Sequence, residues 1–149
     1  MSRSSPRGVG LLDVNVLVAM AWPNHVGHEA ARAWFARNGQ GWATTPITEI
    51  GFVRVCSNRA ALPTSTSPRQ AVEMLGLLCA LPGHAFWEDS VAAVTGGTSL
   101  AGRLQGHRQV TDAHLLALCV ARRGHLVTFD AAIATLAEQP YHVRILEAG

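Results

Sequence analysis

Short apolar runs alternate with longer amphipathic stretches along most of the chain. Five of the runs are short enough to be buried strands, at residues 9–13, 42–45, 84–88, 125–129 and 142–146. Between them, apolar residues recur at helical spacing and predict helices at residues 15–22, 25–37, 46–58, 69–80, 112–123 and 131–138. Strands that alternate with helices are typical of a parallel sheet with helices on both faces, so the sequence predicts an α/β fold.

Residues that begin helices support these boundaries. Thr45 followed by Pro46 is a favoured helix start, with threonine at the cap and proline at the first helical position. Thr111 is expected to cap the helix that begins at Asp112. Residues 95–108 are rich in glycine and predict a short helix and a mobile loop.

One domain accounts for the whole chain. The 149 residues contain no repeat and no candidate boundary, so residues 1–149 are expected to form one domain with residues 1–8 as a flexible tail. The apolar run Val9–Trp22 is interrupted by Asp13 and Asn15 and is too short to span a bilayer, which argues against a membrane protein. Three cysteines without a CxxC pair predict reduced thiols and a cytoplasmic location.

The charged residues suggest a polyanionic partner. All twelve basic residues are arginine, ten residues are acidic, and the formal net charge is +2. If four acids gather in one site, the remaining surface carries six acids against twelve arginines. Genome composition is an equally good explanation for the absence of lysine.

Four acids fall where the predicted topology would bring them together. Asp13 ends the first predicted strand, Asp130 follows the fourth, and Glu49 and Asp112 lie in the first turns of helices. Ligands of open parallel sheets bind beyond the carboxyl ends of the strands. Acids at helix starts are also common as caps, and that role alone explains any single one of them. The coincidence of four favours a site.

Such a cluster has a defined chemistry. Converging carboxylates repel one another unless a cation neutralises them, and oxygen ligands suit Mg²⁺, with Mn²⁺ as a substitute. A hard cation that keeps water ligands can activate water and offset charge on a phosphate. The pattern therefore indicates phosphodiester hydrolysis.

Four segments carry a family resemblance that extends over nearly the whole chain: LLDVNVLVAM at 11–20, TEIGFVRV at 48–55, VTDAHLLALCVARRG at 110–124 and LVTFD at 126–130. In order, spacing and flanking apolar residues they resemble PIN-domain ribonucleases, and among these the VapC toxins of VapBC toxin–antitoxin systems. The resemblance implies a three-layer α/β/α sandwich around a central parallel sheet. It also implies Mg²⁺-dependent cleavage of structured RNA (tRNA or a ribosomal RNA loop), homodimerisation and inhibition by a VapB-type antitoxin.

The resemblance also assigns roles to individual residues. It makes the four acids both the metal ligands and the catalytic residues: Asp13, Glu49, Asp112 and Asp130. Asn15 matches a polar residue that orients the first acid. Thr111 and Thr128 match small hydroxyl residues near the site.

Other polar residues must be judged from their chemistry alone. Arg103, His107 and Arg108 precede Asp112 and could bind RNA phosphates, although an ordinary solvated loop explains them equally well. His25 and His28 have an HxxH spacing, but the sequence shows no third ligand that would make a zinc site.

Four other functions compete with the ribonuclease. A metal-dependent nuclease or phosphatase that acts on DNA or small phosphoesters is one of them. A non-catalytic Mg²⁺-binding module, such as a receiver domain, also places acids at strand ends, but a receiver needs a lysine and this chain has none. A phosphatase with a DxD motif would need an acid at Asn15. A PIN fold used only as an interaction scaffold is disfavoured by the complete set of four acids.

Overall fold

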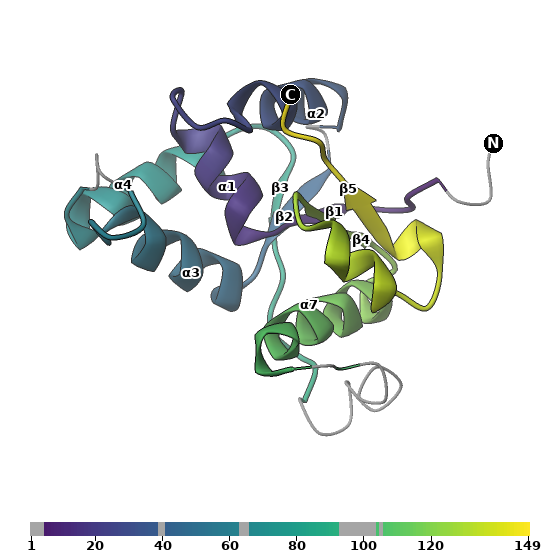
Figure 1. Cartoon of the computed structure of the whole chain (residues 1–149). Helices are drawn as coiled ribbons and strands as arrows, with labels where there is room; N and C mark the ends of the chain where they lie inside the picture. The colour runs from purple at the N-terminus through teal and green to yellow at the C-terminus, as the bar shows by residue number, and fades with distance from the viewer. Residues whose placement is uncertain (1–4, 39–40, 63–65, 93–103, 105) are drawn as a thin grey trace.

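The computed structural model describes residues 5–38, 41–62, 66–92, 104 and 106–149 (Figure 1). Its centre is a parallel sheet of five strands in the order β3-β2-β1-β4-β5. The strands are β1 (Gly10–Leu12), β2 (Trp42–Thr44), β3 (His84–Phe86), β4 (His125–Thr128) and β5 (Val143–Ile145). The α/β prediction with a central parallel sheet is confirmed.

Helices cover both faces of the sheet, which gives the predicted three layers. The α-helices are α1 (Val14–Ala21), α2 (His28–Asn38), α3 (Pro46–Cys56), α4 (Pro68–Cys79) and α7 (Val110–Ala121). The short 3-10 helices are η1 (His107–Gln109), η2 (Ala131–Thr135) and η3 (Pro140–His142). Within the described residues, no helix has the length and apolar character needed to cross a membrane.

Neighbouring residues of each strand enter opposite halves of the core. Leu11 and Leu126 pack against α7 and η2, whereas Leu12 and Val127 pack against α1, α2, α3 and α4. This alternation follows from the two-residue repeat of a strand. It explains why the strands are continuous apolar runs, because both faces of the sheet are buried.

The strand order fixes where a site can form. The chain runs from the central β1 outward through β2 and β3, then returns to the other side of β1 with β4 and β5. The order therefore reverses between β1 and β4, and a crevice opens at the carboxyl ends of these two strands. Asp13 follows β1 directly, and Asp130 lies two residues after β4.

Two local predictions were wrong. Thr111 does not cap a helix, because η1 runs directly into α7 and the chain is already helical at Val110; Thr111 is the second residue of α7 and is exposed. The predicted helix at 131–138 is the short 3-10 helix η2, which ends at Thr135. Thr45, by contrast, occupies the predicted cap position, with Pro46 as the first residue of α3.

Candidate metal and catalytic site

Asp13 follows β1 directly, and each of its two carboxylate oxygens accepts a hydrogen bond that holds it at the crevice. Its Oδ1 accepts from the Val14 amide at 2.8 Å, so it caps α1, and its Oδ2 accepts from the Thr128 hydroxyl at 2.7 Å. Burial raises the pKa of Asp13, opposed by these two hydrogen bonds, and the charge of Asp130 raises it further. Asp13 is therefore a well-oriented but poorly solvated carboxylate.

The hydroxyl of Thr128, the last residue of β4, makes three hydrogen bonds in the crevice. Besides donating to Asp13, its hydroxyl accepts from Asn15 Nδ2 at 3.2 Å and from the Asp130 amide at 3.1 Å. One donated and two accepted bonds use the full capacity of a hydroxyl. Asn15 is fixed at its other end, because its Oδ1 accepts from the Phe129 amide at 3.3 Å. Asn15 and Thr128 thus share one hydrogen-bond network with Asp13, and their supporting role stays a prediction.

The other two aspartates line the same cavity as Asp13. Asp130 is exposed and caps η2, with its Oδ1 accepting from the Ala132 amide at 2.9 Å. Asp112 lies in the first turn of α7. Burial, followed by the charges of Asp13 and Asp130, raises the pKa of Asp112 to about 6. Three carboxylates thus share one electrostatic environment.

No cationic side chain neutralises these carboxylates within the part of the chain that the structure describes. The ion pairs found there are Arg69–Glu73 on the surface and His114–Asp89. The three aspartates line one cavity of about 420 Å³ together with Asn15 and His25. Apolar residues line the rest of the cavity, so the aspartates supply its negative charge. Three carboxylates without a cationic partner among the described residues fit a hard divalent cation that keeps part of its water shell.

His25 is a residue of this cavity whose role the sequence did not reveal. It lies in the turn before α2, and its Nδ1 accepts from the Gly27 amide at 2.9 Å. That bond places the ring proton on Nε2, which leaves an N–H available as a donor. His28, the other half of the HxxH pair, is tied elsewhere, with its Nδ1 2.7 Å from the Ala19 carbonyl oxygen. The HxxH spacing was the available signal, but the pair does not act as a unit.

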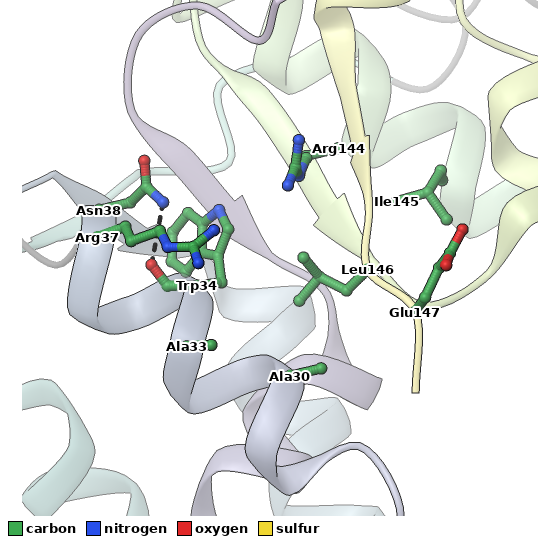
Figure 2. Close-up of a pocket in the computed structure, with 9 residues that line it drawn as sticks. All are labelled: Ala30, Ala33, Trp34, Arg37, Asn38, Arg144, Ile145, Leu146 and Glu147. Carbon is green, nitrogen blue, oxygen red and sulfur yellow. Dashed lines mark hydrogen bonds between the residues drawn. The ribbon is translucent and has the colours of Figure 1, made fainter. Parts of the chain in front are cut away.

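A second cavity, of about 440 Å³, lies between α2 and the C-terminal strand (Figure 2). Trp34, Arg37 and Asn38 line it from α2, and Arg144 and Glu147 line it from the other side. The Asn38 side chain donates to the Trp34 carbonyl at 3.0 Å. None of the residues predicted for the site lines this cavity, so the aspartate crevice is the better candidate for catalysis.

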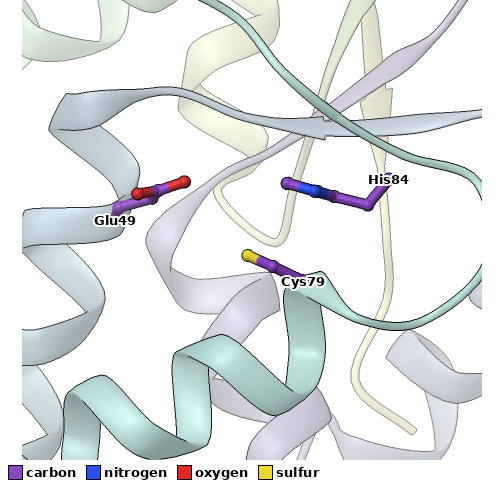
Figure 3. Close-up of side chains that lie close together, drawn as sticks. All are labelled: Glu49, Cys79 and His84. Carbon is purple, nitrogen blue, oxygen red and sulfur yellow. The ribbon is translucent and has the colours of Figure 1, made fainter.

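Glu49 lies in the first turn of α3, as predicted, but its carboxylate is engaged elsewhere. It accepts from the Thr44 hydroxyl at 2.6 Å and lies beside Cys79 and His84 (Figure 3). It is not among the residues that line the aspartate cavity. The helix is nevertheless close to the crevice, because a Cβ placed on Gly51 would lie only 2.5 Å from Val14 Cγ2.

Comparison with known proteins identifies the family. The PIN domain family model matches residues 10–139. Ribonuclease VapC39 of Mycobacterium tuberculosis is 51% identical over 125 residues, which are 83% of this chain and 90% of that protein. Ribonuclease VapC38 of the same organism is 48% identical over 132 residues, 88% of this chain and 92% of its own. This chain belongs to the PIN-domain family, in its VapC branch.

A solved structure supports the PIN fold. The crystal structure of VapBC2 from Rickettsia felis, bound to a DNA fragment from its promoter, matches with a TM-score of 0.61. The match covers 93% of this chain and 99% of that one at 13% identity, so it bears on the fold alone.

Of the remaining predicted residues, His107, Arg108 and Thr111 are not among the described residues that line the aspartate cavity. His107 and Arg108 lie in η1, immediately before α7, and both are exposed. Arg103 lies outside the described residues. Thr111 is exposed on α7. These residues flank Asp112 along the chain, but their part in the site stays a prediction.

Proposed function

We propose that this PIN domain is a Mg²⁺-dependent endoribonuclease, with Mn²⁺ as a possible substitute, and the toxin of a VapBC-type toxin–antitoxin system. The observation that carries the proposal is the set of three carboxylates that share one cavity without a cationic partner among the described residues. The names of the ribonuclease VapC relatives support the choice of RNA as substrate.

In this proposal Asp13, Asp112 and Asp130 hold the cation, and Glu49 completes the acidic set from α3. A bound divalent cation would supply activation of a water molecule and neutralisation of charge on the scissile phosphate. The protein's own groups orient the ligands. Thr128 donates to Asp13 and is itself held by Asn15, so Asp13 would bind a cation with little further loss of side-chain entropy.

His25 is suited to hold the phosphate in place. It lines the cavity, and because its Nδ1 accepts from the Gly27 amide, its Nε2–H can donate. A hydrogen bond donated to a non-bridging oxygen would orient the substrate and stabilise developing negative charge. Arg103, His107 and Arg108 are proposed to bind flanking phosphates of a tRNA or ribosomal RNA substrate, in keeping with the excess of arginine outside the site.

The proposed partners are a VapB-type antitoxin and a second copy of this chain. Apolar side chains stand exposed on α3 and α4, which pack against each other: Ile50 is 60% exposed, Val72 55% and Leu77 73%. Exposed apolar groups of this size on neighbouring helices are typical of association surfaces. They support homodimerisation through this pair of helices.

The proposal is tested on the chain purified without a partner and incubated with total bacterial RNA. We expect discrete fragments with Mg²⁺ and none with EDTA. Asp112→Asn should remove cleavage, whereas Asp89→Asn, the same change at the His114 pair outside the cavity, should retain it. Intact RNA in every sample from folded, Mn²⁺-binding protein would overturn the ribonuclease and leave a non-catalytic metal-binding module.

A further inference from the structure

Three different donor atoms meet beside β2 and β3, and none of the three residues lines the aspartate cavity. Glu49 comes from the first turn of α3, Cys79 is the last residue of α4 and His84 is the first residue of β3. One ligand atom from each lies within 4.8 Å of the other two, and the three side chains point toward a common space (Figure 3). All three side chains are partly accessible to solvent.

The fold holds these groups in place before any cation arrives. His84 pairs with Trp42 in the sheet, and the two rings lie 4.7 Å apart between centroids. The buried Thr44 hydroxyl donates to Glu49 and lies 2.7 Å from His84 Nε2. A hydroxyl has one proton, so His84 donates the second bond in the cation-free chain. Thr44 thus orients two of the three groups, as outer-shell residues do in metal sites.

The donor set selects the class of cation. A thiolate, an imidazole and a carboxylate suit Zn²⁺ and similar borderline cations, whereas Mg²⁺ prefers oxygen alone. Cys79 ends α4, where the helix dipole also attracts a cation.

We propose that Glu49, Cys79 and His84 form a second cation site, selective for Zn²⁺ or a similar thiophilic divalent cation, with the remaining coordination position open to water. This site is separate from the aspartate cavity in its donor chemistry and in two of its three ligands. Glu49 is the shared residue. Resting on the proposed ribonuclease function, a consequence is that occupation of the second site withdraws Glu49 and lowers Mg²⁺-dependent cleavage.

The site is tested by binding, without reference to catalysis. Metal-free protein is titrated with Co²⁺ alone, as a spectroscopic substitute for Zn²⁺, and a thiolate-to-cobalt charge-transfer band is recorded together with Zn²⁺ affinity by calorimetry. We expect one equivalent to produce the band. Cys79→Ser should abolish the band, and His84→Gln should weaken binding while keeping some thiolate signal. Asp112→Asn, which alters only the aspartate cavity, should retain the band and the affinity.

Each outcome decides the proposal. A band in Cys79→Ser would assign it to another thiol, and no band in folded wild type would mean that the three groups bind no thiophilic cation. Thermal unfolding checks that each variant folds, and His84→Gln gives an independent answer if Cys79→Ser does not. In the cleavage assay, added Zn²⁺ should inhibit wild type and spare Cys79→Ser. A band without any ribonuclease activity would support the site and overturn the proposed function separately.

Discussion

Two neighbouring regions of one sheet edge carry the same structural device with different neighbours. At the end of β4, the buried Thr128 hydroxyl donates to Asp13; at the end of β2, the buried Thr44 hydroxyl donates to Glu49. Each hydroxyl fixes one carboxylate at the carboxyl edge. The surroundings then differ, because Asp13 faces two further aspartates and Glu49 faces a thiol and an imidazole.

The comparison shows what determines the chemistry of each region. Like charges gather in the aspartate cavity and raise the pKa of Asp112, so that region needs a hard cation. The other region holds a single carboxylate, and its soft and borderline donors favour a different cation. The hydroxyl at each strand end orients a carboxylate, and the side chains that neighbouring segments bring beside that carboxylate determine the chemistry.

The largest expected effect separates the two carboxylate sets. We expect Asp112→Asn to lower RNA cleavage at least about 100-fold, because it removes a charged ligand from the cavity. Glu49→Gln should lower RNA cleavage by only about tenfold, because Glu49 lies beside Cys79 and His84 and does not line the aspartate cavity. Rates are measured at saturating Mg²⁺ on one RNA fragment. Equal losses would mean that both regions act as one site.

The two threonines give the next contrast. Thr128→Val should raise the Mg²⁺ concentration for half-maximal cleavage about 10–100-fold, because Asp13 loses the group that orients it. Thr44→Val should leave that concentration close to the wild-type value. Each variant leaves buried polar groups unpaired and should lose about 1–3 kcal/mol of unfolding free energy. Similar stability with different Mg²⁺ dependence is the decisive pattern, and a matching Mg²⁺ shift in both would contradict it.

A smaller effect tests His25. Asparagine at this position can still accept from the Gly27 amide but lacks the Nε2–H donor. His25→Asn should therefore lower kcat/KM about five- to tenfold, the net value of one ordinary hydrogen bond. His28→Asn is the matched control, because His28 contacts the Ala19 carbonyl, and it should leave kcat/KM unchanged. A loss shared by both variants would assign the effect to the turn before α2.

The smallest effect concerns the stability of the metal-free protein. The folded-state pKa of Asp112, about 6, lies above its unfolded value, so its contribution to stability is present at low pH and is lost as the pH rises from about 4 through 6. Above about pH 6 the ionised Asp112 therefore destabilises the metal-free fold, and Asp112→Asn removes that charge. Allowing for its partial exposure, we expect about 1 kcal/mol, or a Tm about 2–4 °C above wild type at pH 7.5, and no gain near pH 4. Calorimetry in EDTA measures the Tm of wild type and variant at both pH values. A gain in Tm that is independent of pH would exclude the electrostatic cause.

The contrast between the regions also marks the limit of prediction from sequence. All five strands, the order of the helices and the edge occupied by Asp13 and Asp130 were predicted, because apolar runs and helical spacing record burial directly. The gathering of Glu49 with Cys79 and His84 was not. Cys79 and His84 flank the Pro82–Gly83 turn, but the spacing does not show that Thr44 and Trp42 lie beside them.

The sequence by itself determined the parallel α/β architecture and the strand ends that carry acids, since short apolar runs and apolar residues at helical spacing are local properties of the chain. Tertiary structure decided which polar groups share a cavity. Side-chain direction in the first turn of α3 depends on its close packing at Gly51 against α1, and His25 enters the aspartate cavity through a turn closed by its own hydrogen bond to Gly27. Such choices depend on contacts between segments distant in sequence, and these contacts exist only after the helices have packed on the sheet.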